Sequence, residues 1–392
     1  MANTEATESK KQNPLQELVA HGQSPWLDFI SRKFIQNGEL QKLVDDNELR
    51  GMTSNPSIFG KAIGESEDYD EDIKKFAPES KDAKDLYERL AIKDIQDACD
   101  ILMPVYESSG KLDGCVSLEV APGLAFNTED TIEEARRLWK TVDRPNLMVK
   151  VPATPEGVPA ITRLIAEGIS VNVTLLFAQE AYRYVAEAYI AGLEERAANG
   201  ENISQIASVA SFFVSRIDSE VDKRLDEKIK AITDKPNAAE DTEELEMLKN
   251  LKGKAAIANA KMAYRIYEEL FSGERWENLA KDGANPQRLL WASTGVKNPE
   301  YRDVLYIEQL VGKYTVNTIP PATFDAFREH GEVSETLTSN VEEAEKTLQN
   351  LETVGISLED VTDKLLKDAV KLFVEPFEKM LATVEKARQQ NN

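Results

Sequence analysis

The sequence predicts an α/β protein: a single closed (β/α)8 barrel of the TIM type, with a helical insertion and C-terminal helices packed on it. Eight short segments have the composition and alternation of strands, and most are followed by a helical pattern. A chain of 392 residues has room for one large barrel and an extension. It contains neither a Gly-x-Gly-x-x-Gly nor a P-loop spacing, so an open nucleotide-binding sheet lacks its usual marker.

The predicted strands are short runs of apolar and alternating residues. They occupy residues 24–29, 49–56, 115–120, 146–154, 169–175, 206–216, 287–294 and 314–320, the sixth leading into a helix whose first turn would hold Arg216. In a barrel of this type the active site lies at the strand C-termini. Six strands carry a polar residue at or near that end: Asp28, Asn55, Glu119, Lys150, Thr174 and Ser211. We expect these side chains to meet at the mouth of the barrel.

Helical spacing of apolar residues fills the segments between the strands. It predicts helices over residues 15–19, 29–44, 85–109, 131–140, 155–168 and 179–198, and again from residue 338 onwards. The helix over 85–109 should kink at Pro104 and stop at Gly110. The helix from residue 131 should open with a capping box of Thr131 and Glu134.

The domain organisation follows from these patterns. Residues 1–14 form a polar tail without a signal-peptide core, and residues 15–392 form the barrel. A charged helical stretch over about 218–270, interrupted at 233–242, is interpreted as a solvated insertion. The C-terminal helices, about 338–390, should pack on the barrel through a face that repeats Leu365, Leu366, Ala369, Leu372, Phe373, Phe377 and Leu381.

Composition limits the possible partners. The formal net charge of −23 argues against binding to a nucleic-acid backbone, and an anionic substrate would need a local cluster of cations. No apolar run approaches the roughly 20 residues of a membrane span. We therefore expect a cytoplasmic protein, whose oligomeric state the sequence does not reveal.

Cysteine and histidine usage narrows the chemistry. Cys99 and Cys115 fit buried, reduced thiols better than a disulfide or regulatory pair. With only His21 and His330, and no Cys-x-x-Cys, the sequence offers no three-histidine zinc site, so we expect no metal and no cofactor. Lys, Asp, Glu and Tyr remain as acid–base and nucleophilic groups.

Lys150 is the candidate nucleophile. Period-two alternation places it on one face with Met148 and Pro152, opposite its apolar neighbours. If that face lines a closed interior, desolvation favours the neutral amine, which can attack a carbonyl and form a Schiff base, whereas nearby Asp28 and Glu119 would favour the ammonium. The alternative is a lysine at a strand edge that extends its ammonium to water. The five other polar residues at strand ends favour the buried nucleophile.

Seven segments in order along successive strands resemble the transaldolase family, in its longer bacterial and plant-type branch. They are Trp26-Leu-Asp28, Thr53-Ser-Asn-Pro56, Ser117-Leu-Glu119-Val, Met148-Val-Lys150-Val-Pro-Ala-Thr, Asn172-Val-Thr174-Leu-Leu-Phe, Ser211-Phe-Phe213-Val-Ser-Arg216 and Trp291-Ala-Ser293-Thr-Gly-Val-Lys297-Asn-Pro. The likeness runs from about residue 15 to 385. It implies a metal-free, class I aldolase type of barrel in the non-oxidative pentose phosphate pathway. Such an enzyme transfers a dihydroxyacetone unit from sedoheptulose 7-phosphate to glyceraldehyde 3-phosphate, giving erythrose 4-phosphate and fructose 6-phosphate.

The resemblance also implies roles for individual residues. Lys150 matches the Schiff-base lysine and Asp28 the general acid–base carboxylate. Glu119 matches the glutamate that, with Thr174, holds a water relaying protons. Groups that would contact the phosphorylated sugar are Asn55, Thr53, Asn172, Ser211, Phe213, Arg216 and Ser293, with Arg216 as the phosphate-binding arginine. Shorter family members carry a second arginine near the end of the seventh strand, where this chain offers Lys297.

Two other functions stay open at this point. A fructose-6-phosphate aldolase, a lyase of the same barrel type, would release free dihydroxyacetone. Such enzymes tend to carry glutamine where this chain has Glu119 and tyrosine where it has Phe213. A non-catalytic barrel acting as a scaffold is the other alternative, but it would have no reason to keep a full Schiff-base constellation.

Overall fold

A computed structural model describes residues 12–234 and 242–391. Eight parallel strands, each hydrogen-bonded to the next, close into a barrel in which β8 also pairs with β1. The strands are β1 (Gln23–Asp28), β2 (Gly51–Thr53), β3 (Cys115–Glu119), β4 (Leu147–Pro152), β5 (Val171–Leu176), β6 (Ser208–Phe213), β7 (Arg288–Ala292) and β8 (Thr315–Ile319). The predicted (β/α)8 barrel and the order of its strands are confirmed.

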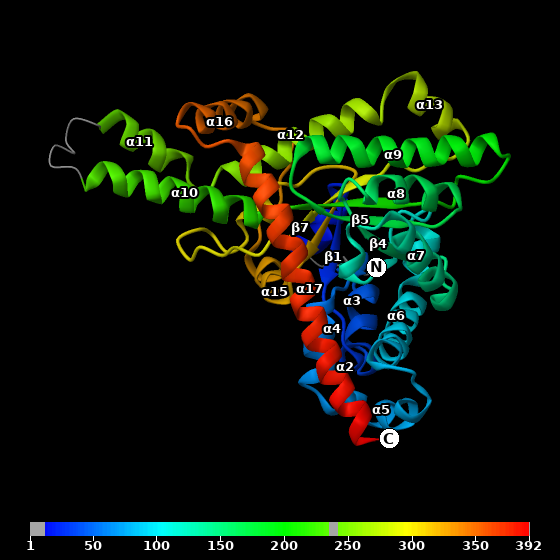
Figure 1. Ribbon diagram of the computed structural model, residues 1–392. Coiled ribbons are helices and arrows are strands. Elements are labelled where there is room, and N and C mark those ends of the chain that lie inside the picture. Colours follow the sequence, from blue (N-terminus) through cyan, green and yellow to red (C-terminus); the bar gives the residue numbers. More distant parts are fainter. Residues whose placement is uncertain (1–11, 235–241, 392) are drawn as a thin grey trace, which may run out of the picture.

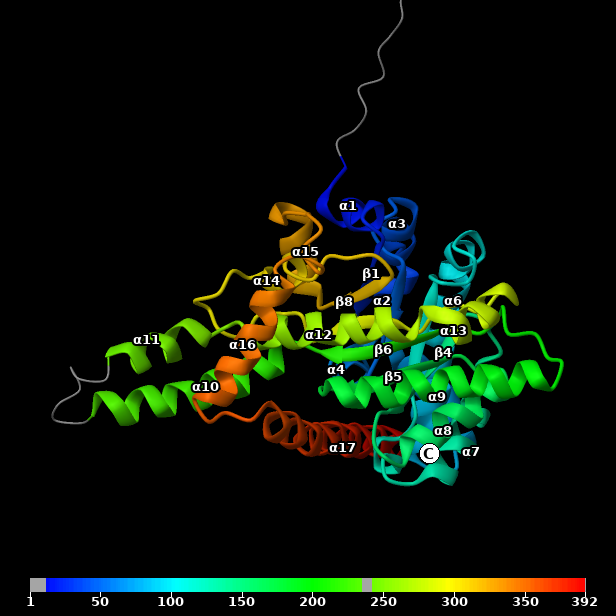
Figure 2. The same cartoon turned by 90° about the horizontal axis from the view of Figure 1, so that it is seen from above.

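Helices surround the barrel (Figures 1 and 2). On the N-terminal half they are α1 (Pro14–Ala20), α2 (Arg32–Gln36), α3 (Glu39–Asp45), α4 (Pro56–Gly64), α5 (Asp70–Phe76), α6 (Ala83–Ser108), α7 (Thr128–Val142), α8 (Gly157–Ala166) and α9 (Gln179–Ala198). They continue with α10 (Ser215–Thr233), α11 (Thr242–Leu251), α12 (Ala255–Leu270), α13 (Gly273–Lys281), α14 (Leu305–Glu308), α15 (Pro321–His330), α16 (Val341–Thr353) and α17 (Leu358–Gln390). Short 3-10 turns are η1 (Glu67–Tyr69), η2 (Ala77–Glu79) and η3 (Pro122–Leu124). Within the described ranges, no helix combines the length and the apolar character that crossing a membrane requires.

Several predicted boundaries on the N-terminal half were wrong. The helix expected over 29–44 is two short helices, because Gly38 adopts a left-handed conformation (φ 85°) between α2 and α3. The second strand ends at Thr53, and Pro56, expected to end it, is the first residue of α4. Helix α6, by contrast, agrees with the prediction, because it runs from Ala83 to Ser108 with Pro104 inside it and stops just before Gly110. The predicted polar tail stops before α1, which starts at Pro14, and residues 1–11 lie outside the described part of the chain.

The predicted capping box of α7 was also wrong. The helix begins three residues earlier, where the Asn127 side chain accepts a hydrogen bond from the amide of Asp130 at 3.1 Å. Glu134 instead accepts a hydrogen bond from the amide of Ala121 (2.7 Å) and forms an ion pair with Lys84 (2.6 Å). This carboxylate therefore binds the turn that follows β3.

The interpretation of 218–270 as solvated fails for its last helix. Helix α12 is buried on most of its circumference, with small residues at Ala255, Ala256, Ala260 and Ala263, and it packs against α9 and α16. Small side chains permit this close approach. The prediction missed them because it was based on the high proportion of charged residues in the whole segment. Figure 1 shows α10 and α11 projecting together from the barrel. Of the predicted interruption at 233–242, residues 235–241 lie outside the described part of the chain.

The C-terminal helix packs back on the barrel as predicted. Helix α17 runs beside α4 and also contacts α6 and α10 (Figure 1). Ala369 is buried, and the predicted Leu365, Leu366, Phe373, Phe377 and Leu381 pack on the core. Leu372 is the exception, because it is 52% exposed and lies off this face.

Trp26 and Gly51 pack tightly against each other in the barrel interior, below its mouth. The indole of Trp26, on β1, is fully buried and lies against Gly51 of β2. A Cβ atom at residue 51 would lie 2.4 Å from that indole, so only glycine fits. Two residues further along each strand, Asp28 and Thr53 pair in the same register and face the mouth.

Candidate active site

Lys150 projects from β4 into the barrel. Its side chain is only 6% exposed, so the alternative in which it extends to water was wrong. The Nζ atom donates a hydrogen bond to the carbonyl oxygen of Ser54 at 3.1 Å and lies 3.4 Å from Oε2 of Glu119. An amine in this position has one fixed acceptor and one carboxylate beside it, and no route to bulk water along its own side chain.

Asp28 is the last residue of β1 and faces the same interior. Its Oδ1 atom accepts a hydrogen bond from the Thr53 hydroxyl at 2.7 Å, and that hydroxyl lies 2.6 Å from the hydroxyl of Thr318 on β8. Burial raises the pKa of Asp28 above its ordinary value, although the Thr53 hydrogen bond and the charge of Lys150 act in the opposite direction. A carboxylate held in this way is suited to exchange protons with a bound molecule.

Glu119 and Thr174 supply two more buried oxygen atoms. The Glu119 side chain is 4% exposed and Thr174 is fully buried. Burial raises the pKa of Glu119; the charge of Lys150 lowers it, and the charge of Asp28 raises it further. Neither Oε2 of Glu119 nor Oγ1 of Thr174 has a hydrogen-bond partner among the residues that the structure describes. Both atoms can therefore bond a water or a substrate hydroxyl.

The backbone is irregular directly after Thr174. Leu175 is in the left-handed region with φ 63°, and the register between β5 and β6 shifts between Val173 and Leu176. A leucine in this conformation is strained, and a bulge re-aims the neighbouring side chains. This irregularity lies at the strand end that carries Thr174.

A chain of hydrogen bonds crosses the barrel interior below these groups. The Asn172 amide donates to the Ser117 hydroxyl at 2.9 Å, and the Ser211 hydroxyl donates to Oδ1 of Asn172 at 2.7 Å. The three side chains come from β3, β5 and β6. Asn172 and Ser211 therefore lie together as predicted, with their orientations fixed by each other and by Ser117.

Asn55 has a structural task as well as a position near the mouth. Its Oδ1 atom accepts a hydrogen bond from the amide of Ile58 at 3.0 Å and so caps α4. Its side-chain NH2 group is the part left to meet a ligand. Thr53, two residues earlier, is committed to Asp28 and Thr318.

Arg216 lies in the first turn of α10, as predicted. Its guanidinium carbon is 5.3 Å from the centre of the Phe213 ring, and that ring lies 5.2 Å from the ring of Phe177. Burial lowers the pKa of this half-buried arginine, and in the described part of the chain no carboxylate forms an ion pair with it. An unpaired cation at a helix N-terminus is suited to a phosphate.

Ser293 and Lys297 follow β7, and the structure brings only the first of them into the cluster. The Ser293 hydroxyl lies 3.0 Å from the hydroxyl of Ser215, at the N-terminus of α10, and its backbone is left-handed with φ 57°. Lys297 is exposed on the loop beyond it. Arg216, Ser215 and Ser293 thus form one group, whereas no contact joins the exposed Lys297 to it among the described residues.

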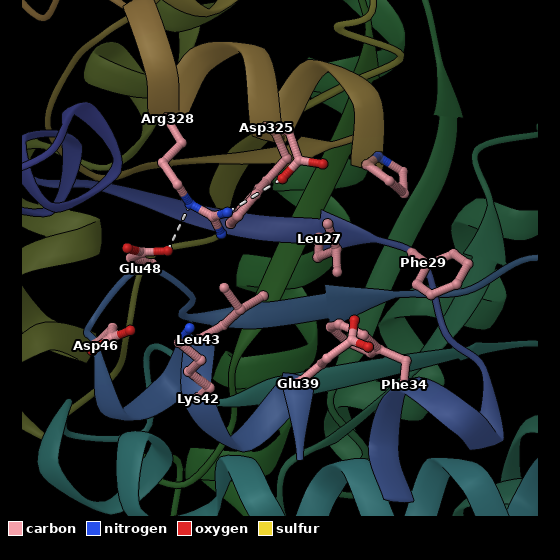
Figure 3. Close-up of a pocket in the computed structure, with 12 residues that line it drawn as sticks. Leu27, Phe29, Phe34, Glu39, Lys42, Leu43, Asp46, Glu48, Asp325 and Arg328 are labelled. Carbon is pink, nitrogen blue, oxygen red and sulfur yellow. Dashed lines mark hydrogen bonds and ion pairs between the residues drawn. The ribbon is translucent and has the colours of Figure 1, made fainter. Parts of the chain in front are cut away.

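A separate cavity lies on the outer side of β1 (Figure 3). It measures about 420 Å³ and is lined by Leu27 and Phe29, between helices α3 and α15. Arg328 lies over it and is bonded to Glu48 at 2.8 Å. Because Leu27 faces this cavity, alternation along the strand turns Asp28 into the barrel.

Sequence reasoning missed three groups of the site. Ser117 alternates with Glu119 on one face, a signal that was available in the sequence. The carbonyl of Ser54 and the hydroxyl of Thr318 were not predictable, because they depend on which strands lie opposite each other across the barrel.

Comparisons with known proteins agree with this geometry. Residues 25–384 match a family model described as "Transaldolase/Fructose-6-phosphate aldolase". A protein named "Transaldolase" from Trichodesmium erythraeum (strain IMS101) is 48% identical over 375 residues, covering 95% of this chain and 97% of that protein. One from Thermobifida fusca (strain YX) is 48% identical over 373 residues, covering 95% and 97%. One from Saccharopolyspora erythraea is 47% identical over 377 residues, covering 96% and 98%.

Proposed function

The chain belongs to the transaldolase/fructose-6-phosphate aldolase family, and we propose that it is a transaldolase, a transferase that uses a lysine Schiff base. Its substrates are phosphorylated sugars: a dihydroxyacetone unit passes from sedoheptulose 7-phosphate to glyceraldehyde 3-phosphate. The observation that carries this proposal is the buried Nζ of Lys150, 3.4 Å from Glu119, in the same interior as Asp28.

Imine formation is assigned to Lys150, Glu119 and Thr174. The neutral amine attacks the ketose C2 carbonyl, the ammonium proton having passed to a neighbouring base, and the carbonyl oxygen leaves as water after protonation. Glu119 is the nearby carboxylate that can accept and return this proton, since burial already raises its pKa. Oε2 of Glu119, which lies beside the Lys150 ammonium, and Oγ1 of Thr174 would hold the water that carries the proton.

Carbon–carbon cleavage is assigned to Asp28. The carboxylate takes the proton of the C4 hydroxyl, the C4–O bond becomes a carbonyl, and the C3–C4 electron pair moves into the iminium to give an enamine. Transfer is the reverse sequence with the second aldehyde. The Thr53 hydrogen bond fixes one Asp28 oxygen and leaves the other for the substrate.

Substrate orientation is assigned to the remaining polar groups. Asn55, Asn172 and Ser211 would bond sugar hydroxyls, and Thr53 would act through Asp28. Arg216, with Ser293 beside it, would bind the phosphate, and Lys297 could add a second positive charge from the exposed loop. Lysine supplies a point charge where arginine supplies a bidentate fork, so this second contact would be the weaker one.

The direct test is the transfer reaction itself. Purified protein is given fructose 6-phosphate and erythrose 4-phosphate, and sedoheptulose 7-phosphate and glyceraldehyde 3-phosphate are measured. A transferase forms both products in equal amounts and releases little dihydroxyacetone without an acceptor. Release of free dihydroxyacetone at a rate similar to transfer would indicate the lyase, and no turnover of either kind would indicate a scaffold.

Arg216→Ala should raise the KM for phosphorylated sugars by about 10- to 100-fold, because a charged hydrogen bond is worth roughly 1.5–3 kcal/mol. Turnover of unphosphorylated analogues should change little. Steady-state kinetics with both substrate sets make the comparison.

Arg216→Lys is the matched control, since it keeps the charge and loses the fork, and its KM should lie between those of the parent and the alanine variant. If Arg216→Ala weakens both substrate sets equally, Arg216 is a structural residue and the phosphate binds elsewhere.

Phe213→Tyr should shift the enzyme from transfer towards hydrolysis. The enamine must survive until the second aldehyde arrives, and its competing fate is protonation followed by release of dihydroxyacetone. The Phe213 ring is 7% exposed and packs against Phe177 and Arg216, so it excludes water without offering a proton. A tyrosine hydroxyl adds a donor at this position. Dihydroxyacetone released from fructose 6-phosphate without acceptor is the measured quantity.

Phe212→Tyr is the control for this experiment. Phe212 lies next to Phe213 on the outer face of β6, against Trp291, so the same hydroxyl is added away from the site. We expect its ratio of hydrolysis to transfer to match that of the parent. An unchanged ratio in a folded Phe213→Tyr variant would mean that Phe213 is ordinary barrel core.

A further inference from the structure

Arg32 forms a buried network just beyond the end of β1. It is the first residue of α2 and the fourth residue after Asp28, and it is 5% exposed. Its Nε atom pairs with Oδ1 of Asp94 on α6 at 3.0 Å, and its Nη1 atom with Asp72 on α5 at 2.7 Å. Asp94 is 1% exposed.

Tyr69 closes the network around the backbone. The backbone amide of Arg32 donates to the Tyr69 hydroxyl at 3.2 Å, and that hydroxyl donates to Oδ2 of Asp94 at 2.7 Å. The guanidinium carbon of Arg32 lies 4.3 Å from the centre of the Tyr69 ring. The side chain of Arg32 therefore bonds Asp94 directly, and its backbone amide is linked to the same carboxylate through the Tyr69 hydroxyl.

A buried ion-pair network of this kind contributes little net free energy to the stability of a fold. Burying an arginine and a carboxylate costs desolvation energy that apolar residues of similar volume would avoid. What directional bonds add is a fixed geometry. Here they fix the backbone at Arg32, while Ser31 caps α2 and Ile30 is fully buried.

The segment after Asp28 needs this fixing because packing leaves one of its sides open. Phe29 and Phe34 line the cavity of about 420 Å³ shown in Figure 3. On that side the two rings pack edge to face, with their centres 5.5 Å apart, and the cavity beyond them leaves room for the chain to move. The Arg32 network lies where α2 meets α6 and η1 and holds the segment from there.

We propose that Arg32, Asp94 and Tyr69 are positioning residues that hold the Asp28 carboxylate at the C4 hydroxyl of the substrate. The inference rests on the role assigned to Asp28 above. It places the effect of the network on one step, the removal of the C4 hydroxyl proton with cleavage of the C3–C4 bond. Imine formation, which uses Lys150 on β4 and Glu119 on β3, does not depend on it.

The test separates these two steps in Asp94→Asn. Imine formation is followed as the rate at which dihydroxyacetone and borohydride label Lys150, since this ketone forms the imine without any cleavage. Cleavage is followed as the single-turnover release of glyceraldehyde 3-phosphate from fructose 6-phosphate. We expect labelling to match the parent and cleavage to slow by about 10- to 100-fold, because small displacements of a reacting group have effects of that order.

Asp113→Asn is the matched control. Asp113 is also buried and accepts from the Ser24 hydroxyl (2.9 Å) and from Arg288 (2.9 Å), but at the opposite end of the barrel. The same carboxylate-to-amide change there should alter thermal stability and leave both steps unchanged per folded molecule. Equal slowing of cleavage in the two variants would overturn the proposal.

Tyr69→Phe keeps the test decisive if Asp94→Asn does not fold. It retains the ring against Arg32 and removes only the hydroxyl that links the Arg32 amide to Asp94. It should show the same split between the two steps to a smaller degree. Parallel loss of labelling and cleavage, or no loss of either, overturns the proposal. Absence of both activities in the parent would instead contradict the proposed function.

Discussion

Lys150→Met is expected to lower turnover by about four orders of magnitude or more, because it removes the nucleophile on which every covalent step depends. Methionine has a similar length and is apolar, so it can fill the same buried space. The loss should therefore occur without large unfolding, although Glu119 would lose the positive charge that lies 3.4 Å away. Steady-state transfer assays and a thermal unfolding curve measure the two effects separately.

The lysine that forms the imine can be identified by mass spectrometry of the labelled peptide. Incubation with fructose 6-phosphate, reduction with borohydride and proteolysis should leave the label on Lys150 alone. Lys313→Met is the matched control, since Lys313 is exposed just before β8, at the end of the barrel away from the mouth. It should label and turn over as the parent does. A label on Lys297 or Lys313, or none, would contradict the assignment.

Local alternation was enough to predict that eight strands form and which polar residues lie near their C-terminal ends, although not where each strand stops. Alternation places Lys150 on one face of its strand with Met148 and Pro152, and the same reasoning places Glu119 and Ser117 together. Parallel barrels bring strand C-termini to one face, so the residue types at six strand ends predicted a polar mouth. The side chains of Asp28, Glu119 and Lys150 do face one interior.

Contacts across the barrel were beyond the reach of the sequence. The bond from Lys150 to the Ser54 carbonyl joins β4 to the chain after β2, and the contact of Thr53 with Thr318 joins β2 to β8. Such contacts depend on the stagger of strands around the barrel, which no local pattern records. The Asn172 bonds to Ser117 and Ser211 have the same origin.

Errors in the helices had a different cause. Glu134 has the right spacing for a capping box, but the backbone amide of Ala121 and the charge of Lys84 bind it instead. Helix α12 lies in a stretch whose average is charged, while its own small residues are buried. In both cases the local sequence pattern is present, but contacts with distant parts of the chain determine the structure.

Asp28 and Glu119 interact electrostatically, so a change in one should shift the pKa of the other, and this tests which of them is the base. Burial raises the pKa of both, and the charge of Asp28 raises that of Glu119 further. The pH dependence of the parent therefore reports the pair, and only variants can separate the contributions.

Asp28→Asn should lower turnover by about 10²- to 10⁴-fold, the usual contribution of a positioned acid–base group. The amide oxygen can still accept from Thr53, so the geometry is kept while the base is lost. Imine should accumulate on Lys150 with fructose 6-phosphate, because its formation does not need Asp28 and its cleavage does. Borohydride trapping measures the imine, and released glyceraldehyde 3-phosphate measures cleavage.

The pH dependence of kcat/KM should shift in a defined direction in each variant. Asp28 acts as a base only when it is ionised. The kcat/KM of the parent should therefore be low at pH values below the raised pKa of Asp28 and should rise as the pH passes through that pKa. In Asp28→Asn the carboxylate that sets this limb is gone, and Glu119, freed from the neighbouring charge, has a lower pKa, so the limb of the residual activity should move to lower pH. Thr53→Val should move it the other way, since the Thr53 hydrogen bond lowers the pKa of Asp28. An acid limb that stays in place in both variants would mean that Asp28 is not the base, and Glu119 would then be the group to test next.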